Sequence, residues 1–376
     1  MHYDYALEKT YKRMLFYENY LAKLELIRYI NNPKTFYKEA AYYKRVDKKK
    51  TFYSKLCKIQ YKNFNRGTGY LTHGFDMYRG SFHGQMIRAL INYCNLNKDD
   101  IILDPFCGSG TTLIEASLLG LKSIGIDINP IACLSSKVKV ESLRKAAKII
   151  SIKNEKYFKI NYYKRNFPFI KDFNRILERN IIDLFYFFNY TRALVMSERF
   201  SVEIIKALRK ISIRNLNLIR RFKKINNILK INLGNSKIFF GNTLDLTKKL
   251  PKNSIGAIIT SPPYLDLIDF MEEDKIQLKN LFENSYISKL KNRSIEGMET
   301  NFFWKEIEEI VLEFNRILKS KSLLILDVGN YKNMEIHFKN ICLKSGFILE
   351  RIIERSIFNK NKIQKNIGFL LFFRKP

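Results

Sequence analysis

The chain has 376 residues, of which 67 are lysine or arginine and 36 are aspartate or glutamate, so its net charge is +31. The length suggests about two domains, and a hydrophobic content of 46% is enough for a packed core and excludes general disorder. The excess of positive charge favours a polyanionic partner, either nucleic acid or a membrane surface.

The positive charge is concentrated in two segments. Residues 1–70 carry a net charge of +10 and residues 136–232 carry +17, whereas residues 71–135 carry −2 and residues 233–376 carry +6. The amino-acid bias of an AT-rich genome would raise lysine everywhere, so it does not explain this distribution. We therefore expect two basic flanks around a near-neutral body.

The cysteines and histidines exclude two classes of small domain. The chain has 5 cysteines, no Cys-x-x-Cys pair and only 4 histidines, so neither a disulfide scaffold nor a zinc site is expected, and a reducing compartment fits. No apolar run approaches the roughly 20 residues of a membrane span, and the N-terminal residues lack the apolar core of a signal peptide. The sequence predicts a soluble, cytoplasmic protein with no metal and no membrane partner.

A regular alternation of strands and helices begins after a basic segment, residues 1–70, that is expected to be helical. Residues 80–94 have apolar side chains at helical spacing. A strand, a glycine-containing turn, a helix and a second strand ending in an acid follow, at 101–104, 105–110, 111–120 and 122–127. This order is the opening of a doubly wound α/β sheet.

The remainder of the chain continues this sheet after an interruption. The segment 136–232 has mostly helical patterns and is far longer than one crossover helix, so we expect an inserted basic subdomain there. The other predicted elements are strands at 236–242, 255–260 and 322–329, a helix at 302–319, and an antiparallel strand pair at 347–358 and 366–373. The predicted fold class is α/β, mostly parallel, with an antiparallel C-terminal pair.

The turn "DPFCGSG" after the first strand has the composition of a ligand-binding turn. Gly108 and Gly110 allow a ligand to approach the backbone closely, and the helix N-terminus behind them favours negative charge. The turn is not a P-loop, because the Gly-Lys-Ser/Thr sequence is absent. Asp127, about twenty residues further on, is placed to accept hydrogen bonds from ribose hydroxyls.

The sequence "ITSPPY" at 259–264 ends another predicted strand. Pro262 and Pro263 stiffen the backbone and thereby present the Ser261 hydroxyl, the Pro262 carbonyl and the Tyr264 ring in one geometry. Two oxygen acceptors can take the two N–H groups of a planar amine while the ring stacks on its face. This arrangement predicts a site for an aromatic amine.

Together, "DPFCGSGTT", "IGIDINP" and "TSPPY" resemble the S-adenosylmethionine-dependent amino-methyltransferases of DNA. The form from Ile259 to Tyr264 matches the signature associated with N4-cytosine enzymes, whereas adenine-N6 relatives more often have Asp or Asn where Ser261 stands. The resemblance covers about 71–135 and 236–376. It implies a Rossmann-like methyltransferase sheet with a cofactor-binding half at 71–135 and a catalytic half at 233–376.

The resemblance also assigns site residues. It implies that S-adenosylmethionine is the cofactor and that Ser261, Pro262, Pro263 and Tyr264 form the catalytic loop. Asn242 departs from the family, which usually has Asp there, although its carbonyl oxygen can still accept a hydrogen bond from the adenine amine. The implied cofactor-binding residues are Tyr78, Asp104, Phe106, Gly108, Gly110, Asp127, Ile128 and Asn242.

The implied reaction is direct methyl transfer to the N4 amine of a cytosine flipped out of double-stranded DNA. A cytosine-C5 enzyme is excluded because the chain has no Pro-Cys pair. Three alternatives remain open: an adenine-N6 methyltransferase, an RNA guanine-N2 methyltransferase and an inactive DNA-binding subunit. By analogy, the protein is the modification enzyme of a restriction-modification system, with a cognate endonuclease encoded nearby as a potential partner.

The basic insert at 136–232 is the candidate for target recognition, because Lys and Arg neutralise phosphates and Arg reads base edges. Residues 1–70 are expected to act as a second clamp. The aromatic side chains of the insert are expected to form its small core rather than to contact bases. The candidate DNA-binding residues are Lys164, Arg165, Arg220 and Arg221.

Overall fold

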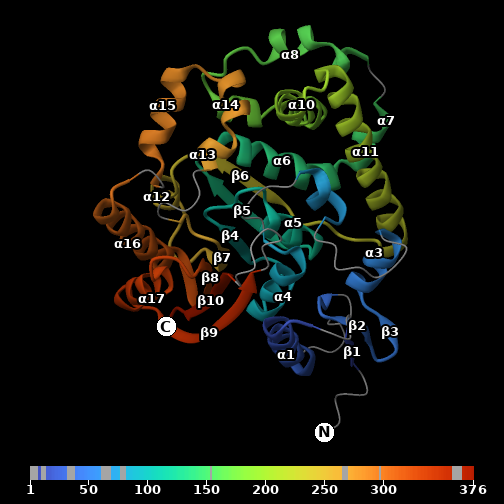
Figure 1. The fold of residues 1–376 in the computed structure, drawn as a ribbon. Helices are drawn as coiled ribbons and strands as arrows, with labels where there is room; N and C mark the ends of the chain where they lie inside the picture. The colour runs from blue at the N-terminus through green and yellow to red at the C-terminus, as the bar shows by residue number, and fades with distance from the viewer. Residues whose placement is uncertain are drawn as a thin grey trace.

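The computed structural model describes residues 7–9, 14–31, 39–60, 69–76, 82–152, 155–264, 270–295, 298–357 and 366–376. At its centre is a sheet of seven strands, wrapped by helices (Figure 1). The strands are β4 (Ile101–Asp104), β5 (Lys122–Asp127), β6 (Ser236–Phe240), β7 (Ile255–Thr260), β8 (Leu318–Gly329), β9 (Ile348–Ile357) and β10 (Asn366–Arg374).

The strand order is β6-β5-β4-β7-β8-β10-β9. The first five strands are parallel, and β10 lies antiparallel between β8 and β9. The chain winds outward from β4 in one direction and returns at β7 on its other side, so a topological switch point lies between these two strands. The predicted doubly wound sheet with an antiparallel C-terminal pair is confirmed.

Helices cover both faces of this sheet (Figure 1). Ile102 of β4 and Ile259 of β7 pack on the side of α4, and the next helices in the chain extend that layer. Leu103 and Ile258, which alternate with them, pack on the side of α16 and α17. The helices of the first face are α4 (Gly84–Cys94), α5 (Thr111–Leu118) and α6 (Pro130–Arg144); those of the second are α12 (Thr243–Thr247), α16 (Thr300–Ile317) and α17 (Met334–Lys344).

The insert is helical, as predicted, and packs on α6 (Figure 1). The predicted boundary at residue 136 falls inside α6, which crosses from β5 toward β6. The buried aromatic side chains of α10 share one hydrophobic core with α5 and α6, because α10 lies across α6. The elements of the insert are α7 (Ala146–Ser151), η3 (Glu155–Phe158), α8 (Ile160–Asn166), α9 (Phe173–Leu177), α10 (Ile181–Phe200) and α11 (Ile204–Leu229).

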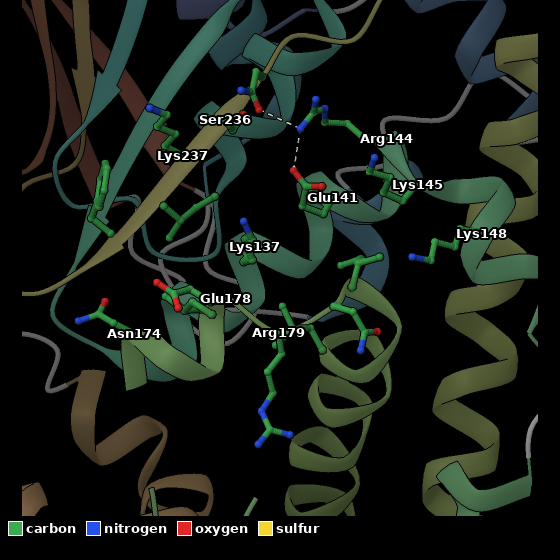
Figure 2. A pocket seen from close by; sticks show the side chains of 17 residues that line it. Lys137, Glu141, Arg144, Lys145, Lys148, Asn174, Glu178, Arg179, Ser236 and Lys237 are labelled. Atoms are coloured by element: carbon green, nitrogen blue, oxygen red, sulfur yellow. Dashed lines mark hydrogen bonds and ion pairs between the residues drawn. The ribbon is translucent and has the colours of Figure 1, made fainter. Parts of the chain in front are cut away.

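A groove of about 580 Å³ runs between the insert and the edge strand β6 (Figure 2). The described residues between β7 and α16 form three helices, of which α14 packs on α10. These helices are α13 (Phe270–Glu273), α14 (Lys275–Leu281) and α15 (Asn284–Arg293).

The N-terminal segment differs from the helical prediction, because it also contains a small antiparallel sheet. The hairpin forms at Asp47 and Lys48, which both have positive φ angles, of 48° and 62°; this backbone is typical of a two-residue hairpin turn. The elements are β1 (Leu7–Lys9), α1 (Phe16–Asn31), β2 (Tyr43–Val46), β3 (Lys49–Lys50), α3 (Phe52–Gln60) and η2 (Leu71–Phe75).

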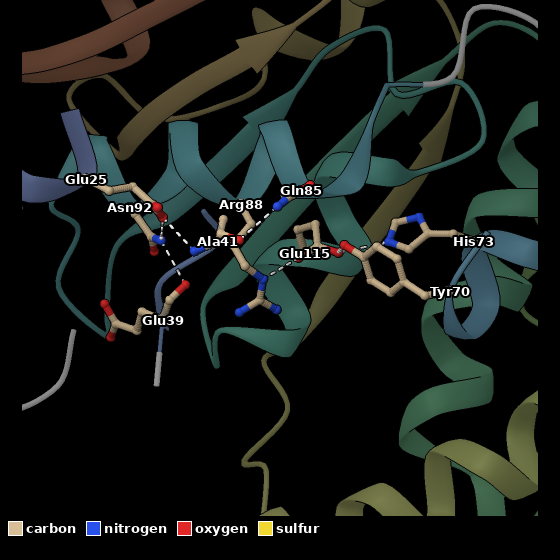
Figure 3. Close-up of polar contacts among 9 residues, drawn as sticks. All are labelled: Glu25, Glu39, Ala41, Tyr70, His73, Gln85, Arg88, Asn92 and Glu115. Carbon is tan, nitrogen blue, oxygen red and sulfur yellow. Dashed lines mark hydrogen bonds and ion pairs between the residues drawn. The ribbon is translucent and has the colours of Figure 1, made fainter. Parts of the chain in front are cut away.

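Two buried carboxylates fasten this segment to α4 and α5 (Figure 3). Glu115 of α5 accepts a hydrogen bond from Arg88 Nε at 2.8 Å and another from Tyr70 Oη. Glu25 of α1 accepts one from Asn92 Nδ2 at 2.7 Å. Although burial alone would raise the pKa of Glu115, the Arg88 guanidinium holds it below its ordinary value. The network therefore fixes α5, the helix that follows the glycine-containing turn.

Candidate functional site

The turn after β4 is held in one conformation by its neighbours. Gly108 and Gly110 have φ angles of 48° and 82°, in the left-handed region that favours glycine. A Cβ atom on Gly110 would lie 2.7 Å from Ser136 Oγ. The Ser136 hydroxyl also donates to Gly108 O at 2.7 Å. Gly110 is therefore needed for the close packing of the turn on α6.

Asp127 ends β5 beside this turn. Its Oδ2 accepts the Gly108 N–H at 2.8 Å, and its Oδ1 accepts the Asn129 N–H at 2.8 Å. A carboxylate has about four acceptor positions, so each oxygen retains room for one more donor. Ile128 follows it and is half-buried. Asp127 therefore keeps open acceptor positions at the carboxyl edge of the sheet, and its role toward ribose hydroxyls stays a prediction.

Asp104 ends β4 and connects the two halves of the site. Its Oδ1 accepts a hydrogen bond from Thr260 Oγ1 of β7 at 2.7 Å, and its side chain is buried. Phe106, two residues on, is half-exposed in the turn. The bond to Thr260 brings the first motif next to the loop that follows β7. Asp104 therefore links β4 to β7. Phe106 and Asp127 are more exposed and lie at the carboxyl edge of the sheet.

Among the described residues, no cation forms an ion pair with either carboxyl. Burial, with a smaller contribution from the charge of Asp127, raises the pKa of Asp104 to about 6. Burial raises the pKa of Asp127 to about 6 as well, with a contribution from Asp274. In a chain with a net charge of +31, this edge of the sheet is locally acidic. It suits a ligand that brings positive charge and hydroxyl groups.

The loop after β6 closes the same edge. Thr243 Oγ1 donates to Pro105 O at 2.6 Å, which joins this loop to the turn after β4. Asn242 is the N-cap of α12: its Oδ1 accepts the Asp245 N–H at 3.2 Å, and its Nδ2 donates to Glu306 Oε1 at 3.0 Å. The structure places Asn242 at the predicted edge, and its role toward an adenine amine stays a prediction.

The four residues after β7 form a compact loop. Ser261 Oγ donates to Asp327 O at 3.0 Å, and Tyr264 Oη donates to the same carbonyl at 3.3 Å. The two hydroxyls lie 3.1 Å apart. Burial raises the pKa of Tyr264 to about 12, so the phenol is neutral at physiological pH. Pro262 and Pro263 are buried, whereas Ser261 and Tyr264 are half-exposed, so the loop offers a hydroxyl and a ring side by side.

A buried ion pair behind this loop was not predicted. Arg355 of β9 donates from Nε to Asp327 Oδ1 at 2.7 Å and from a terminal nitrogen to Oδ2 at 2.6 Å. Gly368 of β10 lies between Arg355 and β8 in the strand register, and it has no side chain to obstruct the arginine. An aspartate within the apolar run "LLILDVG" was the available signal. The pair fixes the residue whose carbonyl holds Ser261 and Tyr264.

The remaining predicted residues lie apart from this edge. Lys164 and Arg165 are exposed on α8, at the outer end of the insert, and Arg220 and Arg221 are exposed on α11 (Figure 1). Tyr78 lies outside the described residues.

In the described part of the chain, no helix is long and apolar enough to cross a membrane. Within the same residues, no group of three His, Cys, Asp or Glu side chains is arranged to hold a metal ion.

The thiols of Cys107 and Cys133 are buried, and burial raises their pKa well above the ordinary value. Neither is poised as a nucleophile.

Comparison with known proteins gives a consistent set of similarities. Residues 4–137 match the family described as DNA methylase. The Type II methyltransferase M.MjaII of Methanocaldococcus jannaschii is 22% identical over 78% of this chain and 78% of its own. The Type II methyltransferase M.BsoBI of Geobacillus stearothermophilus is 40% identical over 27% of this chain and 19% of its own. A tRNA (guanine(10)-N2)-dimethyltransferase of M. jannaschii is 39% identical over 20% of this chain and 22% of its own.

Proposed function

We propose that the chain is an S-adenosylmethionine-dependent DNA methyltransferase and that it methylates the exocyclic N4 amine of cytosine. Its similarity to Type II methyltransferases supports the role of a modification enzyme in a restriction-modification system. The alternatives are the adenine N6 amine and, because of the similarity to a tRNA methyltransferase, the guanine N2 amine. All three are exocyclic amines of a base, so one chemical arrangement serves them.

The bonding of Ser261 is the observation that carries this proposal. The hydroxyl proton is used within the protein, because Ser261 Oγ donates to Asp327 O. The lone pairs of the same oxygen then remain to accept an N–H group from the target amine. The Pro262 carbonyl is the second acceptor in the proposal. A serine in this position accepts a neutral amine without adding a buried charge to the loop.

The reaction follows from these two acceptors. The lone pair of a cytosine amine is delocalised into the ring, and hydrogen bonds from both N–H groups to Ser261 and Pro262 favour a pyramidal nitrogen. S-adenosylmethionine supplies a methyl group on a positively charged sulfur. When bound, the cofactor would give this methyl group to the nitrogen lone pair of the amine held by Ser261 and Pro262 and would leave as a neutral thioether, while the proton released by the nitrogen would pass to solvent. Tyr264 holds the base by stacking, which is worth about 1–3 kcal/mol per base.

The cofactor is proposed to occupy the acidic edge formed by β4 and β5. Asp127 accepts the ribose hydroxyls through its two remaining acceptor positions, Ile128 flanks the adenine, and Phe106 lines the methionine and ribose side. The cofactor is cationic at sulfur and at its amino group, and the carboxyls of Asp104 and Asp127 fit that charge. Gly108 and Gly110 keep the turn close to the ligand.

Double-stranded DNA is proposed to lie against the basic insert. α11 has 26 residues with no acidic side chain, and its exposed face carries Arg220 and Arg221 among other cations. Its opposite face is buried on α10. Such a helix neutralises phosphates, and the target base leaves the duplex to reach Ser261 and Tyr264. Lys164 and Arg165 at the outer end of the insert extend the same surface in the proposal.

Product analysis in cells tests the proposal. DNA and total tRNA from cells that express the wild-type chain or Ser261→Ala are digested to nucleosides and compared by mass spectrometry. We expect N4-methylcytosine in DNA with the wild-type chain and none with Ser261→Ala. N6-methyladenine in its place, or N2-methylguanosine in the tRNA, would move the assignment to the other amine.

A further inference from the structure

The groove along β6 has a strong excess of positive charge. Its lining includes two acids, Glu141 and Glu178. Figure 2 shows that its side chains come from α6, α7, α9, the start of α10 and β6, so the insert and the sheet edge form it together. The cations that line it are Lys137, Arg144, Lys145, Lys148, Arg179 and Lys237.

The four lysines of this groove differ from Arg144, because within the described residues their ammonium groups form no ion pair or hydrogen bond. Arg144 is engaged with Glu141 at 2.9 Å and with Asn235 Oδ1 at 2.8 Å. The four lysines are Lys137, Lys145, Lys148 and Lys237. Lys137 is half-buried, so its charge is partly removed from water without compensation. A bound anion would supply that compensation.

The edge strand offers backbone donors to the same groove. Asn235 accepts a hydrogen bond from Ser123 of β5, and Gly241 donates one to Asp127 of β5. Because backbone groups alternate along a strand, Ser236 and Ile238 turn their N–H groups away from β5. β6 ends the sheet, so within the described chain no further strand takes these groups. Backbone N–H groups of this kind bind phosphate oxygens in protein–DNA complexes.

We infer that this groove binds the phosphodiester backbone of DNA on one side of the target base. The inference rests on the proposed function and adds a second contact surface, separate from α11. β6 lies three strand positions from β7, and a strand spacing of about 4.8 Å puts the groove roughly 14 Å or more to the side of the catalytic loop. At about 3.4 Å per nucleotide along a strand, the groove meets DNA several base pairs from the flipped base.

The salt dependence of DNA binding tests this inference. The affinity of the full chain for a fluorescein-labelled duplex of random sequence is measured by anisotropy over a series of salt concentrations. For Lys145→Glu with Lys148→Glu, both exposed, we expect the slope of log affinity against log salt to fall by about two. For Lys137→Gln we expect a fall of about one.

A matched control separates the groove from net charge. Lys339→Glu with Lys344→Glu makes the same change in charge on α17, at the other end of the sheet, and is expected to keep the wild-type slope. Equal slopes of log affinity against log salt in the groove variants and in the control would overturn the groove assignment. That result is expected if the groove binds an acidic peptide instead of DNA. Product analysis of the wild-type chain is a separate readout: absence of N4-methylcytosine sinks the proposed function without altering these slopes.

Discussion

The carboxyl edge of the sheet and the helical insert carry charges of opposite sign. At the edge, no cation among the described residues forms an ion pair with Asp104 or Asp127, and burial raises the pKa of both to about 6. On α11 of the insert, most cations are exposed and the helix itself has no acidic residue, although Lys206 pairs with Glu203 and Arg209 with Glu155 outside it. The proposed function assigns a cationic cofactor to the first region and a polyanion to the second. Both regions share one hydrophobic core, so the two ligands are brought together by a single folded body.

Aromatic side chains sharpen the same contrast. In the insert, Tyr163 stacks on Tyr190 at 4.0 Å and Phe167 stacks on Phe187 at 3.8 Å between ring centroids. These rings pack against one another in the core of the insert, as the sequence predicted. Tyr264 at the sheet edge is half-exposed instead. In the proposed function, Tyr264 at the edge therefore stacks on the base, and the insert contributes positive charge.

The largest effect is expected from the loop after β7. Ser261→Ala removes one of the two amine acceptors and should lower methylation about 100-fold or more, while leaving S-adenosylmethionine affinity unchanged. Methylation is followed with a tritiated methyl group and cofactor binding by titration calorimetry. Ser254→Ala, which removes a hydroxyl at the other end of β7, is the matched control. Equal loss of binding and catalysis in Ser261→Ala would contradict the separation of base and cofactor sites.

The next effect concerns the ion pair behind that loop. Arg355→Gln leaves Asp327 buried without its cation and should lower the free energy of unfolding by about 3 kcal/mol. Asp327→Asn combined with Arg355→Gln removes both charges and should recover most of that loss. Denaturant unfolding measures both variants. An undiminished stability in Arg355→Gln would show that the pair does not hold the strand beneath the catalytic loop.

A smaller effect is expected from Asp127. Asp127→Asn weakens the hydrogen bonds to the ribose and should reduce S-adenosylmethionine affinity about tenfold. Because the pKa of Asp127 is about 6, the wild-type carboxyl gains a proton below that pH, and its affinity should fall between pH 7 and pH 5. The variant should show a flatter profile. Asp99→Asn, which changes an exposed carboxylate before β4, is the control and should keep the wild-type pH profile. A wild-type pH profile in Asp127→Asn would refute the role of Asp127.

The smallest effect tests the insert. Arg220→Glu with Arg221→Glu should lower the salt slope of DNA binding by about two and leave cofactor affinity intact. The side chains are exposed on α11, so the fold should tolerate the change. If the slope stays at its wild-type value, the exposed face of α11 does not contact the DNA.

Strong local signals predicted the sheet and the position of the site. Strands at 101–104, 122–127 and 255–260 occur where the apolar runs indicated. The turn glycines carry the positive φ angles that the motif requires. These features depend on residues that are close together in the sequence, so they can be recognised from a single sequence.

Other features depend on partners that are distant in sequence. Nothing near Asp104 indicates that Thr260 bonds to it, and nothing near Asp327 indicates Arg355. Nothing near Gly110 in the sequence indicates that Ser136 packs against it, so that a Cβ there would lie 2.7 Å from Ser136 Oγ. The small sheet of the N-terminal segment was missed because its strands have two to four residues. Strands that short have no measurable period.

Transfer of a labelled methyl group by the purified protein tests the central claim most directly. Unmethylated plasmid DNA is incubated with the wild-type chain and S-adenosylmethionine bearing a trideuterated methyl group, then digested and analysed by mass spectrometry. The account predicts deuterated N4-methylcytosine as the product, at a level that Ser261→Ala fails to reach. Deuterium on adenine N6, on cytosine C5 or on no base at all would contradict it.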